Sequence, residues 1–325
     1  MSFTFASFGY DRTEALRSGA VKIEGFDVDC LEMFPRDIFD RMGAEQAFSA
    51  SEFSFCEYVM HHARGNSPFV AIPVFPSKVF RHSYIFINRG SGIRTPKDLE
   101  GKRVGVPLYT MTAALWHRGL LQDEYGVDWR SFKWVQGDAN KAGAHGNPTS
   151  IPKLLRPIDM EPADPGKSLS DMLADGDIDA TVGSRIPSTV GHPAVGRLFP
   201  DFRSVERDYF ICTNIHPIMH LVAIRRDVHE ANPGFAQALC TALCQAKEAA
   251  LAKMRYTAAQ SLMMPFMTAD MEEIDTVFGG DPLSYGIEPN RETLETMIRS
   301  MVEQDYIPDT IPVDDLFLNV EVTGG

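Results

Sequence analysis

Several side chains that could move a proton stand beside apolar segments of this chain. Glu52 lies at the end of one such segment, His82 follows another, and His216 precedes a run of β-branched residues. Carboxylates and imidazoles are common general bases and acids in enzymes. We therefore expect Glu52, His82 and His216 to be candidates for acid–base chemistry. The alternatives are hydrogen-bonded core histidines and a surface Glu52 beside a helix capped by Ser54.

His216 and His220 have a spacing of four residues, which on a helix would place both on one face. Pro217 and the apolar run 218–224 favour a strand instead. The two imidazoles would then stand roughly 13 Å apart, too far to share one small ion. We expect them to act separately, with His220 in substrate binding or buried as a core histidine. A divalent metal held by Glu52 and histidines stays open as an alternative.

Four residues are candidates for binding an anion. Thr110 and Thr112 stand between a predicted strand and a predicted helix, whose first N–H groups favour negative charge. Arg81 precedes His82 on a segment expected to be extended, so one of these two should face a cleft and the other outward. Arg185 follows a strand at 178–182. The alternatives are a helix cap for the threonines, a structural salt bridge for Arg81 and a solvated loop position for Arg185.

Three more residues complete the predicted binding set. Asp11 and Arg12 follow the first predicted strand, and Ser54 follows Glu52. Loops at the carboxyl ends of strands are where open α/β sheets bind ligands. A simple turn and helix start is an equal alternative for Asp11 and Arg12.

The composition excludes several classes of protein. The chain has 325 residues, of which 44% are apolar and 23% charged, as in globular proteins. Its formal net charge of −13 argues against nucleic acid and anionic membranes as partners. An anionic ligand would therefore need a locally positive cleft. The five cysteines form no CxxC pair, and we expect Cys240 and Cys244 to be buried in a helix.

The N-terminal segment has no positive region followed by a long apolar one, and no run of about 18 apolar residues occurs. We therefore expect a cytoplasmic protein.

Strand-like and helix-like segments alternate along the chain, which is typical of an α/β protein. Strands are predicted at 3–8, 26–33, 47–53, 69–75, 84–87, 102–107, 132–135, 178–182 and 218–224. Helices are predicted at 12–17, 35–42, 56–63, 112–122, 168–174, 235–253, 258–264, 270–278 and 291–303. Residues 136–166, rich in Gly, Pro, Asn and Asp, are predicted to be mainly loop.

Several stretches of the sequence resemble one known family. They are SPFVAIPVFP at 67–76, FRHS at 80–83, GKRVGVPLYTMTAALWHRGLL at 101–121, QDEYGV at 122–127, LSDML at 169–173, PIMH at 217–220 and NRETLE at 290–295. Together they resemble the 4,5-dihydroxyphthalate decarboxylases. The resemblance implies an α/β, two-domain type II periplasmic-binding-protein-like fold with a ligand cleft between the domains. We expect residues 1–94 plus 206–325 to form one discontinuous domain and residues 95–205 the other.

The resemblance also implies a function, the loss of CO2 from a hydroxylated aromatic acid. With 4,5-dihydroxyphthalate as the model substrate, a base polarises a phenol and an acid protonates the ring carbon that carries the departing carboxylate. We expect Glu52 as the base, His82 or His216 as the proton donor, and Arg81, Arg185, Thr110 and Thr112 as carboxylate ligands. No organic cofactor is expected, because ring protonation followed by loss of CO2 requires none, and the lack of GxGxxG and GxxxxGK[ST] patterns is compatible with this.

Two other functions stay open at this point. A solute-binding protein for a small anion would share the fold and the cleft but do no chemistry. Another lyase or dehydratase could also use this scaffold. The expected partner is a small aromatic carboxylate, and a homo-oligomer is left open.

Overall fold

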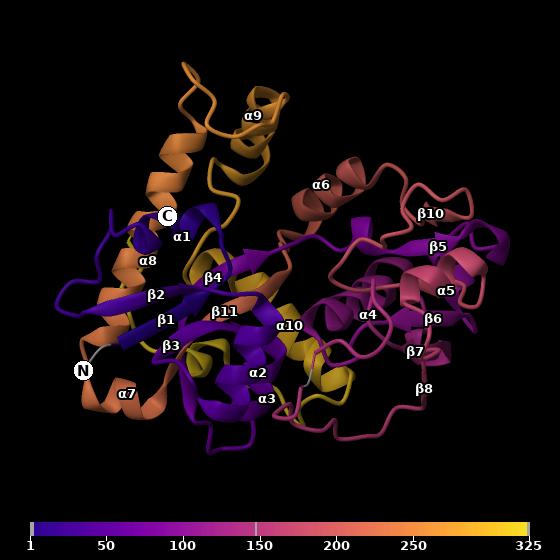
Figure 1. Cartoon of the computed structure of the whole chain (residues 1–325), viewed down its shortest axis with the longest axis horizontal. Coiled ribbons are helices and arrows are strands. Elements are labelled where there is room, and N and C mark those ends of the chain that lie inside the picture. Colours follow the sequence, from indigo (N-terminus) through magenta and orange to yellow (C-terminus); the bar gives the residue numbers. More distant parts are fainter. Residues whose placement is uncertain (1–2, 147, 324–325) are drawn as a thin grey trace.

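The computed structural model describes residues 3–146 and 148–323 of the chain. Two β-sheets form the centres of two lobes, which lie side by side in Figure 1. The first sheet has the order β2-β1-β3-β11-β4, and the second has the order β10-β5-β9-β6-β7-β8. The strands are β1 (Phe3–Ser7), β2 (Val28–Glu32), β3 (Ala50–Ser54), β4 (Phe69–Lys78), β5 (Phe86–Asn88), β6 (Arg103–Val106), β7 (Lys133–Gln136), β8 (Met160–Pro162), β9 (Ala180–Thr181), β10 (Val195–Arg197) and β11 (Ile218–Arg225).

Helices cover both faces of the first sheet and link the two lobes. They are α1 (Asp11–Arg17), α2 (Pro35–Glu45), α3 (Phe55–His62), α4 (Thr112–Tyr125), α5 (Leu169–Asp175), α6 (Phe202–Thr213), α7 (Arg226–Ala231), α8 (Phe235–Met254), α9 (Met267–Phe278) and α10 (Arg291–Glu303). One core packs the first sheet against α2, α3, α4 and α10, and a second packs its other face against α1 and α8. Among the described helices, none is long and apolar enough to cross a bilayer.

The strand directions decide which side chains meet at the edge of the first sheet. Strand β1 runs parallel to β2 and β3, while β11 runs antiparallel to both β3 and β4. The C-terminal ends of strands β1, β3 and β4 therefore lie along one edge of the sheet, across the strand ends. The N-terminal end of β11 lies along the same edge. Register pairs His220 with Ser54 on one side and with Ser77 on the other. A histidine distant in sequence is thus brought to the carboxyl ends of these strands.

The sheets show that the predicted first domain boundary was wrong. Residues 86–88 fall within the range 1–94 assigned to the first domain, yet β5 pairs with β9 and β10 of the second sheet. The chain therefore crosses between the lobes at 79–85 and returns between β10 and β11. The prediction followed turn signals near Thr95, and such signals do not reveal to which sheet a strand belongs.

Most predicted elements are present, but one predicted helix is absent and several observed elements were not predicted. Residues 258–264 are not helical, and Met263 there is fully exposed. A short helix without an apolar face to bury has little to stabilise it. The structure also contains α6, which the sequence did not predict, and only Tyr209 of that helix is buried.

Candidate active site

A buried carboxylate with three hydrogen-bond donors stands at the carboxyl edge of the first sheet. Glu52 on β3 has no exposed surface. Its Oε1 accepts from Tyr10 Oη at 2.6 Å and from His220 Nδ1 at 2.5 Å, and its Oε2 accepts from the Phe8 backbone N–H at 2.9 Å. Tyr10, Glu52 and His220 are called the acid–base cluster below.

The three donors keep Glu52 ionised. Burial acts to raise the pKa of Glu52, but His220, Tyr10 and the Phe8 N–H together lower it below its usual value. Burial and the Glu52 charge raise the pKa of Tyr10, so its phenol stays protonated and donates. Glu52 is therefore a fixed acceptor that has no surface with which to touch a substrate. This corrects its predicted role as the base that meets the phenol.

His220 can reach a ligand through its partly exposed imidazole. Its side chain is 18% exposed, whereas Glu52 is fully covered. The ring of Phe39 packs edge-on against the imidazole at 4.9 Å. Within the described residues, Nε2 of His220 has no protein partner. Since Nδ1 donates to a carboxylate, Nε2 is the nitrogen that can exchange a proton with a ligand.

Asp11 and Arg12 flank the cluster in different ways. Arg12 donates from Nε to the Pro76 carbonyl at 2.7 Å, and its guanidinium stacks 3.8 Å from the centre of the Tyr10 ring. Asp11 is largely exposed and lies 3.1 Å from Arg12. Arg12 thus positions Tyr10, and among the described residues no hydrogen bond or ion pair joins the Asp11 side chain to the acid–base cluster.

The two lobes touch where α3 and α4 begin. Ser54 Oγ and Thr112 Oγ1 lie 3.2 Å apart, and Thr112 Oγ1 also accepts from the Cys56 backbone N–H at 3.2 Å. Ser54 is the N-cap of α3, which was the alternative interpretation of this residue. The N-cap of α4 is Met111, whose side chain makes no capping hydrogen bond. Thr112 is buried against Ser54, and the partly exposed Thr110 lies beside the uncapped start of α4.

The second lobe supplies a histidine–carboxylate pair that the sequence did not single out. His145 Nδ1 lies 3.3 Å from Asp138 Oδ2, and both side chains are nearly covered. Arg185 Nη1 lies 3.9 Å from the same carboxylate, and its side chain is 46% exposed. Arg185 therefore does approach a polar group of the second lobe. The only sequence signal for His145 was its place in the long loop 136–166, which has no periodicity to orient a side chain.

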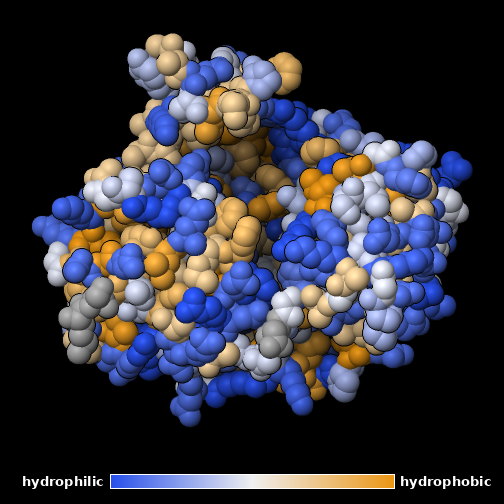
Figure 2. All heavy atoms as spheres, in the orientation of Figure 1, coloured by the Kyte–Doolittle hydropathy of each residue, from blue (hydrophilic) through white to orange (hydrophobic). Residues whose placement is uncertain are grey.

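Arg36 on α2 connects this group to the first lobe. Burial lowers the pKa of His145, and the charges of Arg185 and Arg36 lower it further against the effect of Asp138. The Arg36 guanidinium also lies 5.4 Å from the centre of the Phe39 ring, which packs on His220. Both histidines thus lie close to α2, from opposite lobes. Figure 2 shows the surface hollowed between the two lobes.

Arg81 and His82 do not alternate across an extended segment as predicted. Arg81 has helical backbone angles and is 3% exposed, and His82 begins a 3-10 turn and is 1% exposed. Neither side chain faces outward. Arg81 Nε and Nη1 have no partner within the described residues, so this buried cation could still receive an anion.

His82 is enclosed by aromatic rings. Phe199, Tyr209 and Tyr125 approach it edge-on at 5.1, 5.3 and 6.1 Å. Neither ring nitrogen has a partner in the described structure, and burial lowers the pKa of His82 to about 4. The structure does not bring His82 into contact with Glu52.

His216 lies just before β11 and is separate from the acid–base cluster. Its Nδ1 donates to the Pro282 carbonyl at 3.0 Å, and its ring stacks on Phe80 at 4.4 Å. His216 and His220 are therefore separate, as the strand interpretation predicted. No group of three or more metal-ligating side chains occurs within residues 3–146 and 148–323.

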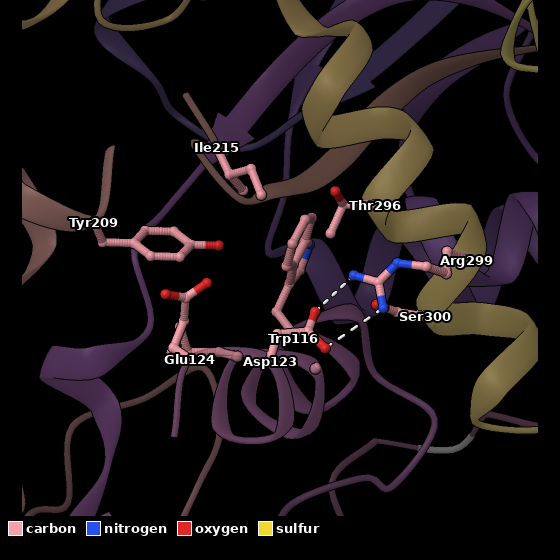
Figure 3. Close-up of a pocket in the computed structure, with 10 residues that line it drawn as sticks. Trp116, Asp123, Glu124, Tyr209, Ile215, Thr296, Arg299 and Ser300 are labelled. Carbon is pink, nitrogen blue, oxygen red and sulfur yellow. Dashed lines mark hydrogen bonds and ion pairs between the residues drawn. The ribbon is translucent and has the colours of Figure 1, made fainter. Parts of the chain in front are cut away.

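A further cavity, of about 180 Å³, lies between α4, α6 and α10 (Figure 3). Its cation, Arg299, is paired with Asp123 at 2.6 Å, and the Glu124 carboxylate also borders the cavity near Tyr209. None of the predicted site residues lines it. A cavity with a surplus of negative charge is a poor site for an anionic substrate.

The two lobes, the sheet order and the hollow between the lobes define a two-domain protein with the periplasmic-binding-protein fold. The periplasmic aliphatic sulphonate binding protein from Escherichia coli has this fold, with a TM-score of 0.54, 12% identity and 97% of each chain covered. No family model matches the chain.

Two curated relatives are more informative. The 4,5-dihydroxyphthalate decarboxylase of Comamonas testosteroni is 34% identical over 304 residues, which cover 92% of this chain and 90% of the relative. The enzyme of the same name from Pseudomonas putida is 36% identical over 212 residues, which cover 65% of this chain and 81% of the relative. The chain belongs to the 4,5-dihydroxyphthalate decarboxylase family.

Proposed function

We propose that this protein removes CO2 from a hydroxylated aromatic acid, with 4,5-dihydroxyphthalate as substrate and protocatechuate as product. The observation that carries the proposal is the His220 imidazole, fixed at Nδ1 by a buried, ionised Glu52 and without a partner at Nε2 among the described residues. The names of the two curated relatives support the substrate class.

The chemistry needs a proton donor aimed at a ring carbon. Each carboxylate of 4,5-dihydroxyphthalate is para to a phenol, whose oxygen pushes electrons toward the carbon that bears the carboxylate. Protonated His220 donates its Nε2 proton to that carbon, the bond to the carboxylate breaks, and its electron pair restores the aromatic ring as CO2 leaves. The product carries the proton where the carboxylate was. Glu52 stabilises the cationic form of His220 and fixes its orientation.

The retained carboxylate requires positive partners. Arg185 is a partly exposed cation on the second lobe, and the uncapped start of α4 beside Thr110 presents backbone N–H groups. We place the substrate between these groups and His220. The second-lobe histidine, His145, is then placed to bind a phenol. None of these steps uses an organic cofactor, and a chelator-treated assay tests for a divalent metal.

The test is turnover by purified protein. Wild-type protein incubated with 4,5-dihydroxyphthalate is expected to release CO2 and form protocatechuate in equal amounts, measured by gas analysis and chromatography. His220→Asn should lower kcat by about 10²–10⁴-fold, which is the usual contribution of a general acid or base. His192→Gln, at an exposed surface histidine, is the matched control and should retain full turnover.

A solute-binding protein is the rival. It would bind the dicarboxylate tightly without forming protocatechuate, and that result with wild-type protein would overturn the proposal. Unchanged turnover by His220→Asn would instead show that His220 is not the proton donor.

A further inference from the structure

A second cavity with a buried cation lies at the return crossing between the lobes. It has a volume of about 250 Å³ and is called the hinge pocket here. It is lined by Lys78, Phe210, Asn214, His216, Phe278, Gly279, Asp281, Pro282, Ser284, Pro289, Asn290 and Thr293. None of these residues belongs to the acid–base cluster, so the hinge pocket is a separate site.

Lys78, the last residue of β4, is held in place by neutral groups only. Its side chain is 7% exposed, and Nζ donates to Ser284 Oγ at 3.1 Å and to Asn290 Oδ1. Asn290 cannot turn away, because its Nδ2 donates to the carbonyls of Ser284 and Gly286 at 3.0 and 2.8 Å. Within the described residues, no carboxylate forms an ion pair with Lys78.

The nearest carboxylate is already committed to another cation. Asp281 pairs with Lys247, a lysine that is 2% exposed on α8. The Asp281 carboxylate is thus committed to Lys247, and burial lowers the pKa of Lys78 to about 7, so its amine is protonated only in part at neutral pH. A buried ammonium without a counter-ion is costly, so an anion that enters the hinge pocket favours the protonated form of Lys78 and accepts a charge-assisted hydrogen bond from it.

The walls of the pocket are aromatic. Phe278 and Phe210 contact each other at 4.5 Å, and the His216 ring lies 5.6 Å from Phe278. His216 is neutral, because burial lowers its pKa to about 3 and the charges of Lys78 and Arg81 act in the same direction. The His216 ring therefore adds a planar polar face to the pocket wall but no second positive charge. Flat walls of this kind pack well against an aromatic ring.

We propose that the hinge pocket binds a small aromatic carboxylate, with the carboxylate on Lys78 and the ring against Phe278 and His216. The pocket volume suits a single-ring ligand, since cavities for drug-sized ligands are roughly 300–1,000 Å³. The inference goes beyond the proposed function and does not depend on it, because a protein without turnover would still bind benzoate there.

The walls also connect the lobes. Phe210 belongs to α6, which precedes the return to the first sheet, and Phe278 ends α9 of the first lobe. Arg203 of α6 pairs with Asp270 of α9 at 2.6 Å. Figure 1 shows α9 projecting from the first lobe on the side where α6 lies. An occupant of the hinge pocket would hold α6 and α9 together.

The direct test locates the ligand. Crystals grown with 4-bromobenzoate should show anomalous bromine density inside the hinge pocket, beside Phe278 and His216. Bromine found in the cleft alone, or nowhere, would overturn the proposal. A bromine in the cleft as well as the pocket is compatible with it, since the cleft also binds aromatic acids under the proposed function.

The solution test uses calorimetric titration with benzoate. Lys78→Gln is expected to weaken binding in the hinge pocket at least tenfold, while Lys78→Arg, which keeps the charge, should retain it. Cyclohexanecarboxylate, which has the charge without the aromatic ring, should bind more weakly than benzoate to wild-type protein. Equal benzoate affinity in wild type and Lys78→Gln would contradict the proposal. Should Lys78→Gln fail to fold, the bromine position in wild-type protein decides by itself.

Discussion

At the scale of single residues, the chemistry of this protein depends on what surrounds each ionisable group. Glu52 and His82 are both buried, but within the part of the chain that the structure describes Glu52 has three hydrogen-bond donors and His82 has no hydrogen-bond partner. The carboxylate consequently stays charged and orients His220, while the imidazole of His82 stays neutral among aromatic rings. Residue type alone could not separate these two outcomes.

Glu52→Gln is expected to lower kcat by about 10²–10⁴-fold with a smaller change in KM, because it removes the charge that stabilises protonated His220. The amide also leaves one of three buried donors without an acceptor, which should cost about 1–3 kcal/mol of unfolding free energy. Steady-state kinetics and urea unfolding measure both effects. Glu124→Gln, at an exposed carboxylate, is the control and should behave like wild type. A normal kcat for Glu52→Gln would show that Glu52 does not position His220 for catalysis.

The stability of the wild type should also fall at acid pH through Glu52. Its pKa is lower in the folded state than in the unfolded chain, so its contribution is fully present above the unfolded value near 4.5. It is lost as the pH falls through the folded value. The difference in unfolding free energy between wild type and Glu52→Gln, measured at pH 7 and at pH 3.5, should therefore shrink at the lower pH. A constant difference would contradict this.

His82→Phe is expected to keep full turnover and to remove an acid-sensitive loss of stability. The folded pKa of about 4 lies below the unfolded value near 6.5, so wild type loses stability as the pH falls from 6.5 toward 4. At pH 5 this loss is about 2 kcal/mol. Urea unfolding at pH 7.5 and pH 5 should show a smaller decrease for the variant. If the unfolding free energy of the variant decreases as much as that of wild type, burial of a neutral His82 is contradicted. If the variant loses turnover, His82 is again a candidate for the proton donor.

At the scale of elements, the starts of two helices join the lobes. Helices α3 and α4 begin within hydrogen-bond reach of each other through Ser54 and Thr112. Thr112 also accepts from a buried backbone N–H of α3, at Cys56. This contact fixes the uncapped start of α4 relative to β3, and so relative to Glu52.

Thr112→Val should lower the unfolding free energy by about 1–3 kcal/mol, because the Cys56 N–H then has no acceptor. Thr112→Ser keeps the hydroxyl and is the matched control, with a loss limited to one methyl group. Thermal and urea unfolding compare the three proteins. Equal stability of the valine and serine variants would show that the hydroxyl does not join the helices.

At the scale of the whole molecule, the two lobes are joined by two chain crossings and by contacts between distant segments. Helix α10 of the C-terminal region reaches α4 through Arg299 and Asp123, at 2.6 Å. Helix α9 reaches α6 through Arg203, which contacts both Asp270 and Glu273. These charge pairs near the surface add to the buried packing of α4 against the first sheet, and salt weakens them.

Arg203→Gln should reduce the thermal unfolding temperature at low salt, by an amount that corresponds to less than about 1 kcal/mol per exposed ion pair. The difference from wild type should disappear near 1 M salt, where the Debye length is about 3 Å. Arg94→Gln, at an exposed arginine with no ion pair among the described side chains, is the control. If the unfolding temperature of Arg203→Gln stays below that of wild type at high salt, the loss comes from packing and not from the ion pairs.

The sequence by itself determined the α/β class, most strands and helices, and the family resemblance. These follow from local periodicity, turn residues and short motifs, all of which act over a few neighbouring positions. It also placed Glu52 near a strand end, two residues before Ser54, for which a helix cap was the alternative interpretation. It could not choose the partner of Glu52 from among nine histidines.

Only the tertiary structure decided that choice. His220 reaches Glu52 because β11 runs antiparallel beside β3, which joins residues 168 positions apart in the chain. The same strand arrangement placed Lys78 at the sheet edge and β5 in the second sheet, neither of which was predicted. Packing enclosed His82 in aromatic rings and His216 beside the hinge pocket. Such contacts arise from sheet register and lobe packing, which depend on the free energy of the whole chain and not on any local pattern.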